Sequence, residues 1–168
     1  MAIPVSLEDA KHQLRIEIDD TSRDDELLGW IADAAGWVER YTGHTLEAVE
    51  VVETLVGANG RWPALQSWPV ADPIALSVGD APHVAGIINP GRRPAQIAPL
   101  AGLRLDGKTF TATVRAGYPD AASVPRNFRR AMLILIAAYD DDREGGDAFA
   151  KAEAAAKSLC RSFRRGAA

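Results

Sequence analysis

The chain has 168 residues and a mass of 18.0 kDa, a size that predicts one domain or one domain carrying a small insert. Its 47% apolar and 25% charged residues are typical of a soluble globular protein, and the single cysteine, Cys160, excludes an internal disulfide. The net charge of −4 argues against a protein that coats DNA, no apolar run approaches the roughly 20 residues of a membrane span, and the first residues lack the pattern of a secretory signal.

Two helices are predicted in the first 44 residues. Ser6 and Asp9 form a capping-box pattern, so the first helix is expected to begin after Ser6 and to end near Ile16. The second is predicted over residues 24–42, capped by Thr21 or Ser22 and stopped by Gly43. Its apolar residues recur every three or four positions and cover about half of the helix surface.

Small residues form a bare strip on the far side of this second helix. Gly29, Ala32 and Gly36 lie there, and a glycine inside a helix costs roughly 0.5–1 kcal/mol relative to alanine. Two explanations stay open: the glycines are tolerated at an exposed site, or a second helix or a neighbouring subunit packs closely against the strip.

The segment 45–117 is predicted to be a small β module. Strands are expected at residues 49–56, 74–78 and 102–105, and Asp106-Gly107 is a hairpin signal before an alternating strand at 110–116. Seven of the ten prolines fall between Pro63 and Pro99 and exclude long helices there. The longest loop is expected at residues 86–99, carrying Arg92 and Arg93.

Helices are predicted again from residue 123 to 165. Ser123 is expected to cap a long apolar helix with Pro125 in its first turn, and Asp147 to cap a final helix. The charges at the ends of the long helix oppose its dipole, at about 0.3–1 kcal/mol for each exposed charge. They are Arg126, Arg129 and Arg130 at the start and Asp140, Asp141 and Asp142 at the end.

These elements predict a mainly α fold. We expect a single domain over residues 1–168: a four-helix bundle formed by residues 1–44 and 123–165, with the small β module of residues 45–117 inserted between the second and third long helices.

No pattern in the sequence predicts a catalytic, cofactor or metal site. The run from Asp140 to Gly145 resembles a calcium loop, but its twelfth position is Lys151 where a bidentate glutamate is needed. The three histidines are far apart in the chain. Cys160 is expected to be a packing residue and not a nucleophile, because no histidine is near it in sequence. We therefore expect no enzyme and no cofactor.

Several motifs, taken in order, resemble the phage head–tail connector proteins, the adaptors of long-tailed phages and of gene transfer agents. They are Ser6-Leu7-Glu8-Asp9-Ala10-Lys11, Asp25-Glu26-Leu27-Leu28 after an acidic linker, Val38-Glu39-Arg40-Tyr41-Thr42-Gly43, Trp68-Pro69-Val70, Ala116-Gly117-Tyr118, Val124-Pro125, and Arg130-Ala131 opening an apolar helix that ends in Tyr139 and Arg143-Glu144. The similarity covers nearly the whole chain.

This resemblance implies a structural protein of the virion neck, assembled in the bacterial cytoplasm. It implies a dodecameric ring below the portal that extends the DNA channel and offers a platform for stopper or tail-terminator proteins. The partners are then other copies of the chain, the portal, the stopper or tail-terminator, and DNA that passes without sequence-specific contact; no membrane and no cofactor are involved.

Two groups of residues are candidates for these contacts. Portal docking is predicted for Arg161, Phe163, Arg164 and Arg165, with a solvated helix end as the alternative. A subunit–subunit interface is predicted for Gly29, Ala32, Gly36, Arg126, Arg129, Arg130, Asp140, Asp141 and Asp142. The alternative function is a small DNA-binding packaging or regulatory protein of a phage-like element that uses the same arginines.

Overall fold

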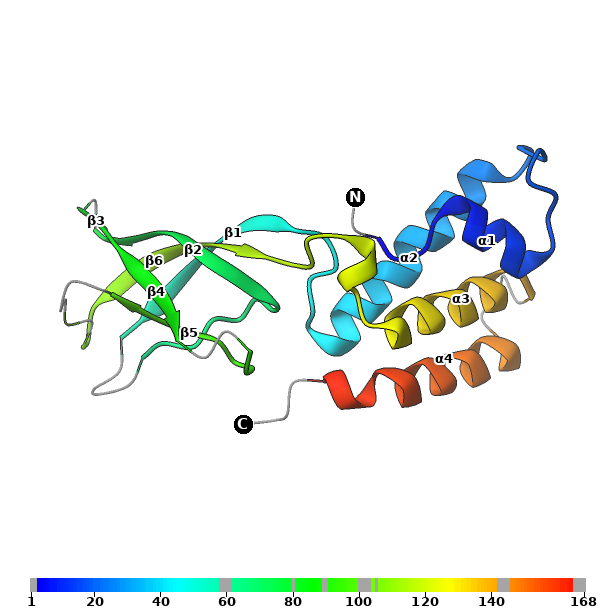
Figure 1. The fold of residues 1–168 in the computed structure, drawn as a ribbon. Coiled ribbons are helices and arrows are strands. Elements are labelled where there is room, and N and C mark those ends of the chain that lie inside the picture. The colour runs from blue at the N-terminus through cyan, green and yellow to red at the C-terminus, as the bar shows by residue number, and fades with distance from the viewer. Residues whose placement is uncertain are drawn as a thin grey trace. The chain divides into compact units, whose positions relative to one another are not determined.

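The computed structural model of the chain describes residues 3–57, 62–79, 81–88, 91–99, 104, 106–141 and 146–164 (Figure 1). The chain forms two compact units, which are described separately. Residues Met1–Leu46 and Pro119–Ala168 form a helical unit, and Glu47–Tyr118 form a β unit.

The helical unit is built around one central helix. It contains α1 (Leu7–Leu14), α2 (Asp24–Thr42), α3 (Arg126–Asp141) and α4 (Asp147–Cys160), with short 3-10 turns at Ala121–Ser123 and Arg161–Phe163. Helix α3 packs against each of the other three (Figure 1). It buries six apolar residues in doing so: Phe128, Ala131, Met132, Leu135, Ile136 and Ala138. The apolar middle of α3 therefore supplies the core of this unit.

The observed helix boundaries agree with the predicted boundaries more closely than the observed caps agree with the predicted caps. The capping box of α1 is confirmed, because the Asp9 amide donates to Ser6 Oγ and the Ser6 amide donates to Asp9 Oδ2. Gly43 ends α2 at a φ of +66°, as predicted.

The other predicted caps are wrong. Arg23, without a side-chain cap, precedes α2, and Gly146 precedes α4. Ser123 lies in a 3-10 turn before α3, where its amide donates to the Asp120 carboxylate. Adjacent polar residues offer several equivalent caps, and the tertiary fold selects among them.

The β unit contains a four-stranded antiparallel sheet and a separate two-stranded sheet. The larger sheet has the order β1 (Val49–Val56), β6 (Thr109–Ala116), β2 (Val70–Val78) and β3 (Ala81–His83). Strand β1 pairs with β6 along its whole length, and the smaller sheet pairs β4 (Ala85–Ile88) with β5 (Gln96–Pro99). Of the predicted strand at 102–105, the first arm of the Asp106-Gly107 hairpin, only residue 104 is described, and it is not part of a strand.

The β unit has its own hydrophobic core. It is formed by Leu55, Leu65, Val70, Leu76, Ala95, Ile97, Phe110, Ala112 and Val114. The buried carboxylate of Glu53, on β1, accepts hydrogen bonds of 2.8 Å from the backbone amides of Gln66 and Ser67. This carboxylate fastens the segment before β2 to strand β1.

The expected mainly α four-helix bundle is therefore wrong. Residues 47–118 form a second compact unit with a sheet and a core, where the sequence predicted only a small insert. The size of this unit was underestimated because its prolines were interpreted as loop residues. Pro73 occupies a register irregularity of β2, and Pro82 lies in β3, a sheet edge, where a missing N–H is tolerated. The predicted long loop at 86–99 is also wrong, since β4 and β5 form there.

Candidate interaction surfaces

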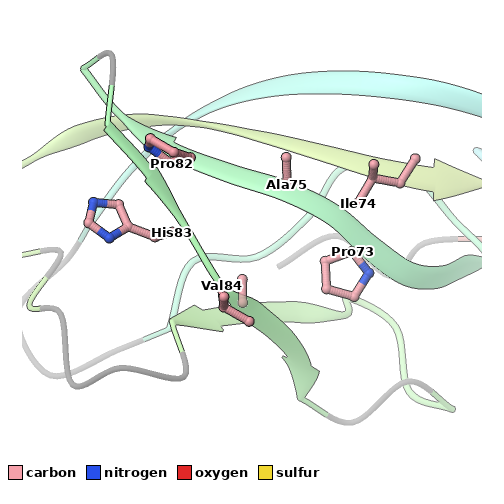
Figure 2. Close-up of a pocket in the computed structure, with 7 residues that line it drawn as sticks. Pro73, Ile74, Ala75, Pro82, His83 and Val84 are labelled. Carbon is pink, nitrogen blue, oxygen red and sulfur yellow. The ribbon is translucent and has the colours of Figure 1, made fainter.

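The described residues offer little chemistry of the kind that a catalytic or metal site needs. None of them form a group of three or more His, Cys, Asp or Glu side chains that could hold a metal ion. An open hollow of about 370 Å³ lies over β2, β3 and the start of β4 (Figure 2). Its lining is apolar apart from His83 and comprises Pro73, Ile74, Ala75, Pro82, His83, Val84 and Ala85.

Cys160 is a packing residue, as predicted. Its side chain is buried, and burial raises the pKa of its thiol to about 11. A thiol with this pKa is protonated at neutral pH, and the thiolate is the form that acts as a nucleophile.

The C-terminal segment packs against its own helical unit. The Phe163 ring lies 4.8 Å from the Phe128 ring at 69°, and both contact the buried His44 edge-on. Arg164 lies 5.2 Å from the centre of the Tyr41 ring, in cation–π geometry. Phe163 therefore helps to close the helical core, while Arg161 and Arg164 remain exposed. Arg165 lies outside the described residues.

The strip of small residues on α2 faces outward. A Cβ added at Gly29 meets no atom within 4 Å, and one at Gly36 meets only the Arg40 guanidinium, at 3.1 Å. Ala32 is exposed as well. No helix within the described residues covers the strip, which leaves tolerance at an exposed site or a neighbouring subunit as its explanation.

Two of the charges that oppose the α3 dipole are paired within the chain. Arg129 Nη2 lies 2.6 Å from Asp9 Oδ1 at the start of α3, and Arg23 Nη2 lies 2.5 Å from Asp140 Oδ1 at its end. Partial burial raises the pKa of Asp9, but hydrogen bonds from Ser6 and from Arg129 outweigh it, so that the pKa lies below its ordinary value.

The remaining charges at the ends of α3 point to solvent. Arg126, Arg130 and Asp141 are exposed, and no ion pair joins them to another described residue. Asp142 lies outside the described residues. Because Arg129 and Asp140 are already paired within the chain, only Arg126, Arg130 and Asp141 among the described charges still support the predicted subunit–subunit interface.

The structure brings the two predicted groups of arginines together. Helices α3 and α4 pack side by side and run in opposite directions (Figure 1), so the start of α3 lies beside the end of α4. Asn127 Nδ2 donates to the Leu159 carbonyl across this junction, at 3.0 Å. We call the resulting exposed surface the arginine end of the helical unit; it comprises Arg126, Arg130, Arg161 and Arg164.

The opposite end of the helical unit carries acidic residues, of which the sequence predicted only Asp141 as a contact residue. Arg23 joins the start of α2 to the end of α3, and so brings the α1–α2 connection beside Asp141. We call this surface the acidic end; its exposed acids are Glu17, Asp19, Asp20, Asp25 and Asp141, and Arg15 is an exposed cation beside them. The acidic α1–α2 connection could be seen in the sequence. Its position beside the end of α3 could not, because it depends on the tertiary fold.

The comparisons with known proteins agree with the sequence motifs. Residues 4–65 match the family of the phage gp6-like head-tail connector protein. The predicted resemblance to head–tail connectors is confirmed. No curated protein matches this sequence.

Three solved structures of gene transfer agent (GTA) particles contain chains of similar fold. A chain in the virion of the native particle has a TM-score of 0.78 and 21% identity, and covers 99% of this chain and 92% of that chain. A chain in the neck of the empty particle, computed with C6 symmetry, has a TM-score of 0.77, 20% identity and the same coverage. A chain in the neck of the native particle, computed with C12 symmetry, has a TM-score of 0.72 and 21% identity over 99% and 91%.

These likenesses extend over both units, whereas the family match covers the first helices and β1. Within the part of the chain that the structure describes, no helix is both long and apolar enough to cross a membrane. The family match and the shared fold together support a structural role as a connector.

Proposed function

We propose that this chain is a structural subunit of a head–tail connector, assembled in the bacterial cytoplasm as a ring below the portal of a phage or gene transfer agent particle. The ring extends the DNA channel and offers a platform to stopper or tail-terminator proteins. The observation that carries the proposal is the likeness over 99% of the chain to chains of GTA necks, together with the connector match at residues 4–65.

The charge of the chain is consistent with this role. Cationic contacts to phosphates drive nonspecific DNA binding, so a chain with a net charge of −4 can border a channel without holding the duplex. We assign no catalytic role, cofactor or metal ion to it. The twelvefold ring, like the identity of its partners, is part of the proposal.

We assign portal docking to the arginines of the C-terminal segment. We do not include Phe163 among the solvent-facing docking residues, because its ring packs against Phe128. We also retain the strip Gly29, Ala32 and Gly36 as a close-contact surface for a neighbouring subunit, since a bare helix surface permits near approach of another backbone.

The test is the content of particles made without the chain. Deleting its gene should yield DNA-filled heads that lack tails, and restoring the gene should return both the tails and a chain that can be labelled at the neck in electron micrographs. Tailed, infectious particles in the deletion strain would refute the proposal. Tight, salt-sensitive binding of the isolated chain to duplex DNA would instead favour the DNA-binding alternative.

Portal docking is tested separately by deleting residues 165–168 together with R161A and R164A. This design keeps Phe163 in place, so the helical unit should remain folded. Loss of co-purification with the portal is expected, and unchanged co-purification would refute the docking site. The exposed pair Arg104 and Lys108, replaced by alanine, is the control.

A further inference from the structure

The helical unit is electrically bipolar, and the charges that it carries on α3 oppose the dipole of that helix. The arginine end lies at the start of α3, where the helix dipole is positive, and the acidic end includes the end of α3, where the dipole is negative. The chain compensates one charge at each end, through Asp9 and Arg23. The remaining exposed charges on α3, Arg126, Arg130 and Asp141, therefore need a partner outside the unit, or stay unfavourably placed.

The two ends cannot compensate each other within one copy. Helix α3 has 16 residues and is about 24 Å long, whereas charges in physiological salt are screened beyond about 8 Å. Two copies in head-to-tail order, in contrast, bring an arginine end and an acidic end within contact distance.

The complementarity concerns exposed groups on both sides. Arg126 and Arg130 are exposed and form no ion pair with any described residue, and the same holds for Asp19, Asp25 and Asp141. Exposed charges of the other sign also lie at each end. Among the described residues they include Asp120, which caps the Ser123 turn, and Glu8 at the arginine end, and Arg15, which ends α1, and Lys151 at the acidic end. The majority sign at each end is nevertheless opposite.

We infer that Arg126 and Arg130, in the part of the arginine end that α3 supplies, dock on the acidic end of the next copy, and that this contact is the repeating interface between neighbouring subunits. Arg161 and Arg164 stay assigned to the portal. The contact joins two different surfaces, so a regular rotation from copy to copy closes it into a ring, while a translation would give a filament. This inference rests on the proposed function and specifies the surface through which the ring forms.

Charge reversal with restoration tests this interface. The first variant, R126E/R130E, makes the arginine end acidic, and the second, E17K/D19K/D141K, makes the acidic end basic. Residues 126, 130 and 141 then carry the sign that the α3 dipole favours, so the thermal stability of both variants should hold or rise. R104E/K108E, in the β unit, is the control with the same change in net charge as the first variant.

Each variant is expressed in place of the wild-type gene in the bacterium that makes the particles. The amount of chain per DNA-filled head is then measured. Because like charges then face each other, incorporation of each of the two variants alone should fall by at least about tenfold, and that of the control should not change.

Expressing both variants in the same cell supplies the decisive measurement. In a head-to-tail ring, every contact between the first and the second variant pairs opposite charges again. Rings of alternating copies should therefore form, with incorporation near the wild-type level and the two variants in equal amounts. The single chain R126E/R130E/E17K/D19K/D141K should be restored likewise.

The possible outcomes separate this inference from the proposed function. Full incorporation of the variants expressed alone, or no restoration by co-expression while the variants remain folded, would overturn the interface. If the arginine end binds only the portal, co-expression and the fivefold variant both fail to restore incorporation. Absence of the wild-type chain from particles, in contrast, would overturn the proposed function itself.

Discussion

A buried lysine fastens the turn between the first two helices. Lys11, on α1, is only 3% exposed; its Nζ lies 2.6 Å from Asp24 Oδ1 and donates a 3.1 Å hydrogen bond to the Ile18 carbonyl. Asp24 Oδ1 is buried and accepts no hydrogen bond from another described residue, so Lys11 is its counter-charge. The substitution Lys11→Met keeps most of the apolar stem and removes the ammonium group.

The expected loss follows from what remains after the substitution. Hydrogen bonds to charged groups contribute about 1.5–3 kcal/mol each, and breaking a fully buried ion pair costs about 3–5 kcal/mol. The Asp24 side chain is 25% exposed, so water recovers part of this loss. We therefore expect the free energy of unfolding to fall by about 2 kcal/mol, which lowers the melting temperature by about 4–8 °C for a chain of this size.

The control is a lysine of the same helical unit in a surface ion pair. Lys157 lies 2.8 Å from Glu153 one turn earlier on α4, and its side chain is 44% exposed. Solvent screens such a pair, so Lys157→Met should cost less than about 0.5 kcal/mol. Urea unfolding followed by circular dichroism at helical wavelengths measures both variants. A loss for Lys11→Met no larger than that for Lys157→Met would refute the role assigned to this lysine.

Three further predictions concern the β unit and the cysteine. Gly117→Ala should destabilise the chain by more than about 2 kcal/mol, because φ is +107° and the added Cβ overlaps the Glu47 carbonyl. The control, Gly107→Ala, has a φ of +69° and an added Cβ in open space, so it should cost only about 1 kcal/mol. Thermal unfolding measures both variants, and equal losses of stability would contradict this reasoning. Glu53→Gln turns an amide NH₂ toward the backbone N–H of Gln66 or Ser67 and should lower the free energy of unfolding by about 1–3 kcal/mol. The control, Glu50→Gln at an exposed position, should leave the stability unchanged. Chemical denaturation compares the two variants, and an unchanged stability of Glu53→Gln would contradict the role assigned to this carboxylate. Cys160, whose pKa is raised to about 11 by burial, should stay unreactive toward a water-soluble disulfide reagent in mildly alkaline buffer and react fully in urea, and rapid reaction of the folded chain would contradict its burial.

The helices could be predicted from the sequence because their signals are local. The apolar spacing of α2 and α3 and the Gly43 stop depend on residues within one or two turns of one another, and the structure reproduces them. Strand β6 is predicted for the same reason, since buried and exposed residues alternate along it.

The β unit was underestimated because its pairings are not local. Strand β6 pairs with β1 and β2, which lie far from it in sequence, and β2 accommodates Pro73 through a shift in register. Prolines predict a loss of helix but do not distinguish a loop from an edge strand. The strands β4 and β5 were therefore missed.

The candidate surfaces were recognised in pieces. The arginines at the start of α3 and at the end of the chain were each selected, but only the antiparallel packing of α3 and α4 joins them into one surface. The acidic end depends on the contact between Arg23 and Asp140, whose partners are 117 positions apart in sequence. No local pattern reports a contact of this range.

The two ends of the β unit meet each other. Glu47 and Tyr118, its first and last residues, form a parallel bridge, so the polypeptide enters and leaves this unit at neighbouring points, about 5 Å apart. A domain that took the place of this segment between Leu46 and Pro119 would need termini that lie equally close, because the helical unit continues on both sides of it.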